Sequence, residues 1–430
     1  MRSIAVCVLV VLTSIAGLAS KGYARATEKT LYTFNGKANG GYPGDLVSDS
    51  LGNLYGMTQT GGNRATCNGL GCGIVFELSP TVAGKWTETI LYEFAGGMDG
   101  RYPQGGMVFD ADGNLYGMTN NGGTFDSGII FELSPGTEGP WKETILYTFT
   151  GGADGGRPAG ELIFDSAGNL YGTAGFGGDL TCPIQHPIGC GIIFRLTPNV
   201  GNSILTVLYA FHGHEGAYPS KLAMDATGNL FGTTNSGGSS SICRYGCGVV
   251  FELAPLADGS WNYSVLHAFS GGRDGGTPDA GVVLDATGNL YGTASIGGNP
   301  ACFTFGCGLV FELSPVSGGR WKENVLHSFN GGTDGSFILP GVVLDPEGNL
   351  YGVTYVGGLI SDECPSGCGR VYELSRTSDG KWKETNLYGF KGGADGVNPY
   401  SGLLRDASGH LFGSAFGGAP NASEVFQITP

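Results

Sequence analysis

A short phrase, "DATGNLYGT" at Asp285 to Thr293, decides the fold, and it stands again almost unchanged as "DATGNLFGT" at Asp225 to Thr233. The aspartate can cap a turn through its side chain, the Asn or Gly can adopt a positive φ, and the flanking apolar residues can continue two antiparallel strands. The phrase therefore predicts a β-hairpin. Because seven equivalent catalytic aspartates would be unusual, we interpret the aspartates of all its copies as structural: Asp49, Asp110, Asp165, Asp225, Asp285, Asp345 and Asp406.

The phrase recurs at nearly even intervals along the whole chain, and its degenerate last copy reads "DASGHLFGS". Around each copy, four short segments follow in a fixed order. In one unit they read "GVVLD", "NLYGT", "GLVFELSP" and "WKENVLHSF", from Gly281 to Phe329. Each segment is rich in β-branched or aromatic residues and is bounded by Gly, Pro, Asp or Asn, which is typical of a strand. Four strands in each of seven repeats indicate a β-propeller or a β-solenoid.

The two ends of the repeat array favour the propeller. The last unit stops after its third strand, "EVFQITP", whereas an extra fourth-strand segment, "KTLYTF" at Lys29 to Phe34, precedes the first full unit. In a closed ring these strands can share one blade, which removes the exposed edges of an open array. We therefore predict an all-β, seven-bladed β-propeller of four-stranded antiparallel blades, in which one N-terminal strand pairs with three C-terminal strands.

The repeat also resembles a known family. The pattern "GNLYGxT…GG…CGxVFxLxP…LYxF" is similar to the GloVer tandem repeat of secreted "choice-of-anchor" bacterial proteins, and it covers essentially the whole chain from Thr27 onward. More loosely, "DxxGNLYG" resembles the hairpin of NHL-type propellers. Both resemblances imply propeller geometry, and neither implies a reaction.

The N-terminal segment, from Met1 to Ala26, has the composition of a secretory signal. Arg2 gives a charged start, Ile4 to Ala19 form an apolar run, and Ala24-Arg25-Ala26 is a small-x-small cleavage site. The run is shorter than the roughly 20 residues that a membrane span needs. We expect a signal peptide at 1–26, a single propeller domain at 27–430, and a secreted protein, extracellular or periplasmic, that does not span a membrane.

The charge of the chain restricts its partners. A formal net charge of -15 argues against nucleic acid, because binding to a phosphate backbone requires clustered Lys and Arg. We expect a monomer with an acidic, solvated surface and an extracellular glycan or protein as its ligand.

Ten cysteines outside the signal come in close pairs, each between a second and a third strand. Repeats with a long connection there have a pair, and repeats with a short one have none, as expected of disulfides in an exported protein. Zinc ligation usually joins two pairs, so we expect no metal at the cysteines. The predicted bridges are Cys67–Cys72, Cys182–Cys190, Cys243–Cys247, Cys302–Cys307 and Cys364–Cys368.

The cysteine loops and the blade-to-blade connections should emerge together on one face of the ring, where the repeats differ most. Loops on a rigid scaffold commonly carry function. Aromatic residues beside a charge suit a sugar or a peptide, although Phe303 and Phe305 have the alternative of packing under their own loop. The candidate ligand-binding residues are His186, Arg244, Tyr245, Phe303 and Phe305.

The blade connections hold a second set of candidates. "GGxDG" recurs with Asp99, Asp154, Asp274, Asp334 and Asp395, whereas the fourth unit reads "HGHEG". A ring of carboxylates can gather calcium or act as general acids, but repeated Asp-Gly pairs favour ordinary turns. The chain has no GxSxG, P-loop or HExxH motif. We therefore favour a secreted binding or scaffold protein without a cofactor. The alternative is a hydrolase or lyase acting on a polysaccharide or a lactone through His212, His214, Glu215 or Asp274.

Overall fold

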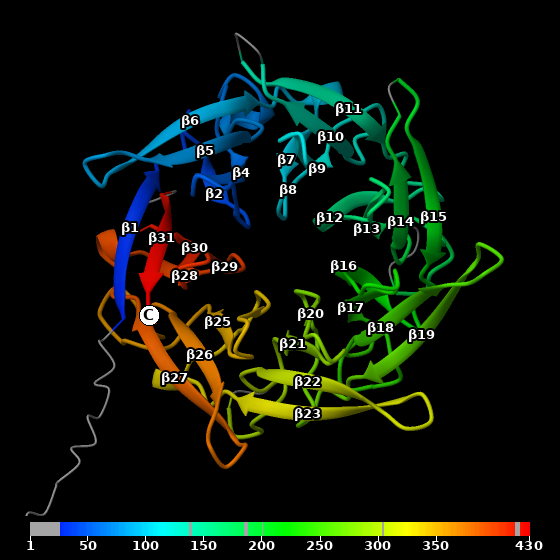
Figure 1. Cartoon of the computed structure of the whole chain (residues 1–430), viewed down its shortest axis with the longest axis vertical. Coiled ribbons are helices and arrows are strands. Elements are labelled where there is room, and N and C mark those ends of the chain that lie inside the picture. The colour runs from blue at the N-terminus through cyan, green and yellow to red at the C-terminus, as the bar shows by residue number, and fades with distance from the viewer. Residues whose placement is uncertain (1–25, 137–139, 185–187, 200, 303–304, 418–421) are drawn as a thin grey trace, which may run out of the picture.

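Seven antiparallel sheets stand side by side around a central axis in the computed structural model (Figure 1). The structure describes residues 26–136, 140–184, 188–199, 201–302, 305–417 and 422–430, so nearly all of the expected signal segment lies outside it. Each sheet is one blade, and its strands follow one another from the central channel to the outer edge of the propeller. The predicted all-β, seven-bladed propeller is confirmed.

The second and third strands form the middle of each blade, and they are the most buried because both of their faces are covered by neighbouring blades. The second strands are β4 (Leu54–Thr60), β9 (Leu115–Asn121), β13 (Leu170–Phe176), β17 (Leu230–Ser236), β21 (Leu290–Ala294), β25 (Leu350–Thr354) and β30 (Leu411–Phe416). The third strands are β5 (Ile74–Pro80), β10 (Ile129–Ser134), β14 (Ile192–Thr197), β18 (Val249–Pro255), β22 (Leu309–Val316), β26 (Arg370–Arg376) and β31 (Ser423–Thr429).

The outermost strands close the ring as predicted. They are β6 (Trp86–Glu93), β11 (Lys142–Thr148), β15 (Ile204–Ala210), β19 (Trp261–Ala268), β23 (Arg320–Ser328), β27 (Trp382–Gly389) and, in the last blade, the N-terminal strand β1 (Thr27–Phe34). Strand β1 pairs with β31 along its whole length, from Thr27 opposite Thr429 to Phe34 opposite Ser423. The first and last strands of the ring therefore share one sheet.

Five of the innermost strands are short or split in two, and the other two, β12 and β16, shift their register. Proline stands at or just before the break or shift in most of them, and because proline has no N–H, it cannot donate to the ladder. They are β2 (Gly41–Pro43) with β3 (Val47–Ser48), β7 (Arg101–Pro103) with β8 (Val108–Phe109), β12 (Gly156–Phe164), β16 (Ala217–Met224), β20 (Val282–Leu284), β24 (Val343–Leu344), and β28 (Val397–Pro399) with β29 (Leu404–Arg405).

The repeated aspartate of the hairpin phrase is structural, as predicted. Asp285 Oδ1 accepts hydrogen bonds from the backbone N–H groups of Thr287 and Asn289, and its Oδ2 accepts one from the Tyr291 hydroxyl at 3.1 Å. Burial alone would raise the pKa of this carboxyl, but these hydrogen bonds lower it. The first copy repeats the arrangement around Asp49, so the phrase is a turn that connects the first two strands of each blade.

The blades adhere through one repeated aromatic contact. A Phe at the end of the fourth strand, or directly after it, is fully buried or nearly so in every blade, and it lies edge-on or tilted against an aromatic ring in the third strand of the next blade. The pairs are Phe34–Phe76, Phe94–Phe131, Phe149–Phe194, Phe211–Phe251, Phe269–Phe311, Phe329–Tyr372 and Phe390–Phe426, with ring centroids 4.9 to 5.6 Å apart. This apolar contact is the same at every blade boundary, including the closing one.

Loops of two kinds lie on opposite faces of the ring. The face that carries the five cysteine loops and the blade-to-blade connections is called the stapled face below. It includes the four short 3-10 turns: η1 (Cys67–Gly69), η2 (Gly97–Asp99), η3 (Gly332–Asp334) and η4 (Gly393–Asp395). In the part of the chain that the structure describes, no helix is long and apolar enough to cross a membrane.

Candidate functional site

One position in the interrupted innermost strands breaks the sevenfold repeat. It lies directly before the buried apolar residue of that strand, such as Leu222. Four blades have glycine there, Gly106, Gly281, Gly341 and Gly402, whereas the first, third and fourth blades have Asp45, Glu161 and Lys221. These three charged residues line the central channel and are called the channel floor below.

The channel floor is an ion-paired cluster drawn from distant parts of the chain. Lys221 Nζ lies 2.9 Å from Asp45 Oδ2 and 3.8 Å from Glu161 Oε2. Asp45 Oδ1 also accepts a hydrogen bond of 2.7 Å from the backbone N–H of Gly402. The three side chains are 24–30% exposed, so they face the channel and not the packed core.

The pKa values of the channel floor follow from this geometry. Burial would raise the pKa of Asp45, but Lys221 and the Gly402 N–H lower it. The Asp45 carboxylate raises the pKa of Lys221. Burial raises the pKa of Glu161, which has no hydrogen-bond partner among the described residues. The floor thus holds one satisfied ion pair and one carboxyl group whose hydrogen-bonding capacity is free.

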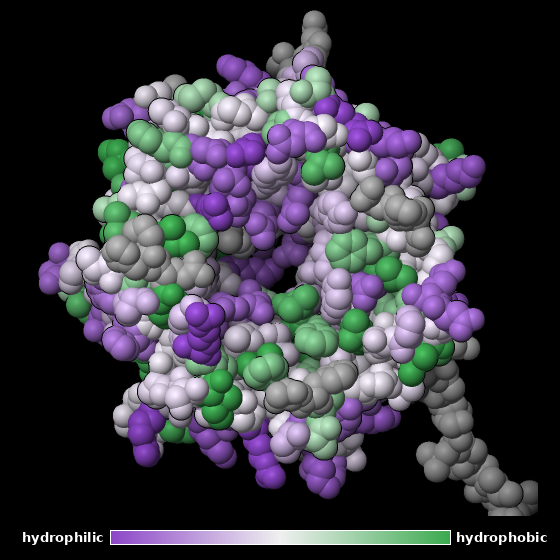
Figure 2. Space-filling view, turned by 180° about the vertical axis from the view of Figure 1, so that it is seen from behind, coloured by the Kyte–Doolittle hydropathy of each residue, from purple (hydrophilic) through white to green (hydrophobic). Residues whose placement is uncertain are grey.

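A cavity of about 540 Å³ lies above the channel floor, toward the stapled face. We call it the channel mouth. One part of its wall is polar, with Gln104, Asn120 and Asn235, and another is apolar, with Ala280, Leu339 and Pro340. Figure 2 shows this opening, with hydrophilic side chains along one side and hydrophobic ones along the other. A second cavity, of about 280 Å³, lies on the other side of Asp45 and Lys221. It is lined by Glu161, which does not line the channel mouth, and by several Val and Leu residues.

The rim of the channel mouth has an unusual backbone. In every blade, the second residue of the innermost segment has a positive φ although it is not glycine, at a cost of roughly 1–2 kcal/mol each. In most blades the N–H of this residue donates to a carbonyl of the preceding blade, often that of its second cysteine, as Tyr218 does to Cys190 at 2.9 Å. The seven rim residues are Tyr42, Tyr102, Arg157, Tyr218, Thr277, Phe337 and Asn398, with φ from 48° to 61°.

Most other positive-φ positions of this chain are glycines. Glycine would relieve the strain at the rim, yet none of the seven rim residues is glycine. Several rim side chains make contacts that glycine could not make: Tyr42 packs edge-on against Phe416, Tyr218 packs against Phe176, and Asn398 donates a hydrogen bond to the Tyr355 carbonyl.

Aromatic rings and one arginine crowd this rim. The Arg157 guanidinium lies 4.8 Å from the centre of the Phe176 ring, and Phe176 is edge-on to Tyr218 at 5.9 Å. Farther around the ring, Tyr400 and Phe416 lie 4.5 Å apart. The channel mouth therefore offers flat apolar surfaces next to amide and charged groups, a composition that suits small polar ligands.

The five predicted disulfides are present. Each joins the two cysteines of one loop, with Cα atoms 5.1 to 5.7 Å apart, and no described bridge joins two blades.

The sequence-based ligand candidates lie on or near these loops. The Arg244 guanidinium lies 5.0 Å from the centre of the Tyr245 ring, Tyr245 is 37% exposed, and Phe305 is 63% exposed. His186 and Phe303 lie outside the described residues.

The carboxylates of the blade connections hold turns together. Asp274, for example, accepts hydrogen bonds from the backbone N–H and the hydroxyl of Ser270, and it lies 3.6 Å from His267 Nε2. In the other "GGxDG" copies, the aspartate binds the backbone N–H four residues earlier and a Tyr or His of the fourth strand.

The residues of the "HGHEG" segment point to different partners. Glu215 accepts hydrogen bonds from the His212 backbone N–H at 2.7 Å and from the Tyr209 hydroxyl at 3.2 Å. The His212 ring lies 2.8 Å from Asp179, and the side chain of His214 is exposed. Neither these residues nor Asp274 are among the described residues that line the channel mouth.

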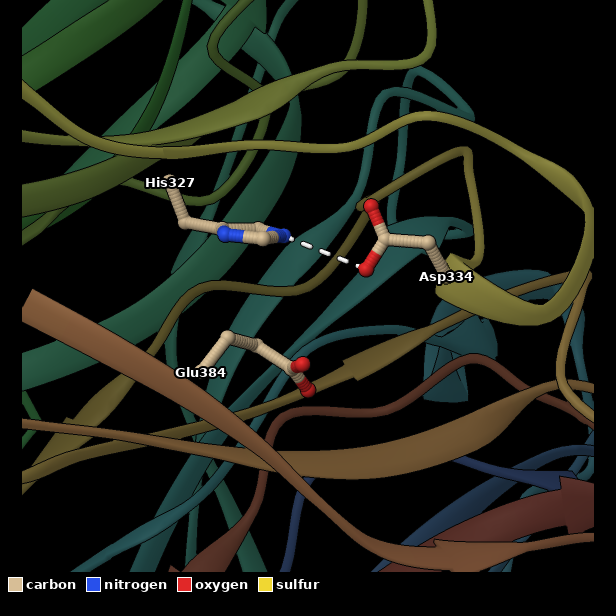
Figure 3. A group of neighbouring side chains, drawn as sticks. All are labelled: His327, Asp334 and Glu384. Carbon is tan, nitrogen blue, oxygen red and sulfur yellow. Dashed lines mark hydrogen bonds and ion pairs between the residues drawn. The ribbon is translucent and has the colours of Figure 1, made fainter.

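Figure 3 shows a further cluster, of His327, Asp334 and Glu384, at the boundary between the fifth and sixth blades. His327 Nε2 lies 3.3 Å from Asp334 Oδ1. The buried Arg370 lies 2.7 Å from Glu384 Oε1 and 3.3 Å from Asp334 Oδ1. Because this guanidinium already supplies positive charge between the carboxylates, the cluster fits an internal ion-pair network better than a metal site.

Uniform four-stranded blades around one asymmetric channel mouth define a repeat-built β-propeller. The model of a family described as the Gloeobacter/Verrucomicrobia repeat matches residues 18–183, 144–358 and 243–430. The chain therefore belongs to this repeat family, as the GloVer resemblance implied. No curated protein matches the chain. Membership of a propeller repeat family suggests a binding or scaffold role and specifies no ligand.

Sequence reasoning missed the channel floor. Its residues carry no motif and are far apart in the chain. The sequence did contain a signal. When the seven repeats are aligned on the buried apolar residue of the innermost strand, such as Leu222, the position directly before it is glycine in four repeats and a charged residue in three.

Proposed function

We propose that this protein is a secreted, non-enzymatic binding propeller whose ligand is a glycan held in the channel mouth on the stapled face. The observation that carries the proposal is the asymmetry of the mouth: the channel floor of Asp45, Glu161 and Lys221 interrupts an otherwise repetitive channel. A ring of equivalent blades offers a specific ligand few distinct sites, and this one is concave and central.

The composition of the channel mouth supports a glycan over a peptide. Sugars present flat patches of C–H groups beside many hydroxyls, which match aromatic rings such as Phe176 and Tyr400 beside the amides of Asn120 and Asn235. The mouth is a single compact cavity of about 540 Å³, within the size range of small-ligand sites. An extended peptide would instead favour an exposed strand edge or a long groove.

The loop residues singled out in the sequence enter the proposal as an outer subsite. Arg244 and Tyr245 share one cysteine loop. Burial and, to a smaller extent, the neighbouring Tyr245 raise the pKa of the rim residue Tyr218, so the two tyrosines are near each other. A ligand longer than the mouth can extend over this loop. Phe305 is exposed on the next cysteine loop around the ring.

The test is a screen of the protein without its segment 1–26 against glycan and peptide arrays, followed by calorimetry on the hits. Two sets of variants separate the subsites: Phe176→Ala and Tyr400→Ala in the mouth, and Tyr245→Ala and Phe305→Ala on the loops. Leu256→Ala, an exposed change in a third-to-fourth-strand hairpin on the opposite face, is the control.

We expect a glycan hit that the mouth variants weaken about tenfold or more and the control leaves unchanged. The glycan should be recovered intact after prolonged incubation. Peptide-only hits, hits indifferent to the mouth variants, or a cleaved glycan would each contradict the proposal.

A further inference from the structure

The channel floor offers an unusual combination of groups to a ligand. Lys221 is held by Asp45 at 2.9 Å, and Glu161 lies 3.8 Å from the same ammonium group with no hydrogen-bond partner among the described residues. Asp45 and Lys221 line the channel mouth, and Glu161 lines the second cavity on the far side of this ion pair. A ligand group that passes Lys221 therefore meets an ammonium donor with N–H groups to spare and, within a few ångströms, a free carboxyl acceptor.

We infer that the site selects the neutral class of glycans, whose adjacent hydroxyls donate to Glu161 and accept from Lys221. This inference rests on the proposed function and names its ligand class. Two neighbouring hydroxyls of a sugar ring can act at once as donor and acceptor, so they satisfy both groups without adding charge to the site.

Anionic glycans fit the floor poorly. It contains two carboxyl groups and one ammonium group, and the ammonium is already paired with Asp45. A uronate or sulfate would meet Glu161 without a free cation at the floor to neutralise it, and the acidic chain adds repulsion over a longer range. Arg157 does carry a positive charge, but it lies at the rim, over Phe176.

Cationic glycans fit poorly for the opposite reason. An amino sugar bound to Glu161 would place its ammonium beside Lys221 Nζ, which is only 3.8 Å from that carboxylate. Outside the floor, Asp279 also lines the mouth, and each of its oxygens already accepts a hydrogen bond, from Asn235 and from Ser295, which leaves fewer acceptor sites for an amine. Hydroxyl groups are the remaining partners that suit both side chains of the floor.

The amide and apolar side chains in the wall of the mouth also suit an uncharged ligand. Asn120 donates to Gln104 at 3.1 Å, and these two amides retain further donors and acceptors for hydroxyls. On the apolar part of the wall, Leu339 and Pro340 offer a surface for the C–H face of a sugar ring.

The experiment compares hexasaccharides of one length and three charges. Neutral hexamers of glucose, xylose and mannose, hexagalacturonate, and a fully deacetylated glucosamine hexamer are titrated calorimetrically against the protein at pH 7 and about 0.15 M salt. The variants are Glu161→Gln, which removes the charge and keeps the shape, and the double change Asp45→Asn with Lys221→Met, which removes the ion pair without leaving a single unpaired charge. Glu347→Gln, an exposed change in a hairpin on the opposite face, is the matched control.

We expect at least one neutral hexamer to bind about tenfold or more tightly than both charged hexamers. Glu161→Gln should weaken that neutral hexamer about tenfold and narrow the discrimination against hexagalacturonate, which a merely structural role of Glu161 would not do. The double variant should weaken the neutral hexamer as well, and Glu347→Gln should change neither.

The possible failures are distinguishable. Tight binding of a charged hexamer that depends on Glu161 or Lys221 would overturn the neutral class and leave the proposed glycan site in place. Neutral binding that Glu161→Gln does not alter would overturn the role of the floor. If no glycan on the array and none of the hexamers binds, the proposed function fails and this inference fails with it.

Discussion

Lys221 of the fourth blade and Asp45 of the first blade meet across the central channel, with Nζ and Oδ2 2.9 Å apart, although 176 positions separate them in the chain. Asp45 is also bound by the backbone of Gly402 in the last blade. One ion pair thus links blades from the beginning, middle and end of the ring, and it separates the polar upper cavity from the apolar lower one.

Breaking this pair on one side should be costly. We expect Lys221→Met alone to lower the free energy of unfolding by about 1–3 kcal/mol, because Asp45 would remain in the channel without its cation. The double variant Asp45→Asn with Lys221→Met should recover most of that loss. Urea unfolding of the unaltered protein and the two variants measures both effects. Equal losses in the single and double variants would show that the loss does not come from the unpaired carboxylate of Asp45.

Relieving the backbone strain at the rim should leave the protein at least as stable and should weaken ligand binding. Replacing Arg157 by Gly relieves a φ of 49° and leaves its N–H free to donate to Ser127. We expect the free energy of unfolding to stay the same or rise by up to about 1 kcal/mol, while ligand affinity falls with the loss of the cation over Phe176. Thermal unfolding and calorimetry on one preparation test this. A less stable Arg157→Gly variant would contradict our account of the rim.

The blade boundaries should make the protein more stable in weak acid than in weak base. Burial, together with Asp99, raises the pKa of Glu143 to about 8, and burial, with Glu28 and Asp395, raises that of Glu424 to about 8. Their ordinary value is near 4.5, so the folded state binds these protons more tightly than the unfolded state. Their contribution to stability is complete below about pH 4.5 and is lost as the pH rises toward about 8.

We therefore expect the melting temperature to fall by about 5 °C or more between pH 5.5 and pH 9. Glu143→Gln and Glu424→Gln should each flatten this dependence, and the exposed control Glu347→Gln should not. A melting temperature that rises over this interval, or a slope unaffected by both variants, would refute the assignment to these groups.

Reduction of the disulfides should loosen the cysteine loops and the rim residues bound to them, and it should leave the blade strands paired. Each bridge closes one short loop and contributes at most about 2 kcal/mol, and no described bridge links two blades. However, the backbone carbonyl of the second cysteine in a loop accepts a hydrogen bond from the N–H of a rim residue in the next blade. The Cys247 carbonyl, for example, accepts from the Thr277 N–H at 2.7 Å. Mild reduction should keep the far-ultraviolet circular dichroism, increase proteolysis in the loops and weaken ligand binding. Loss of the β signal would contradict this.

The fold was predictable because it is repetitive and local. The hairpin at Asp285 is encoded within one short phrase, and each cysteine partner lies within one loop, so a short stretch of sequence contains its own contacts. Ring closure by β1 also followed from the sequence, because one unit lacked the strand that another had in excess.

The candidate site was less predictable for the same physical reason. The channel floor forms only when the ring closes and brings together Asp45, Glu161 and Lys221. No spacing in the sequence predicts that contact. His212 and Glu215, in contrast, are close in sequence, but Glu215 is bound by a backbone N–H and Tyr209, and His212 turns to Asp179. Closeness in sequence was therefore a poor guide to the site, because the side chains of His212 and Glu215 are used within their own loop. The channel floor was missed because its three residues are far apart in the chain.

The pairing of β1 with β31 sets an order of events during biosynthesis. A ribosome makes β1 first and β31 after all the other strands, so β1 must wait unpaired while the intervening blades emerge. Individual blades can form as they appear, yet the circle cannot be sealed before the last strand has been made. Completion of the ring, and with it the assembly of Asp45 against Lys221 and Gly402, is therefore the final step of folding.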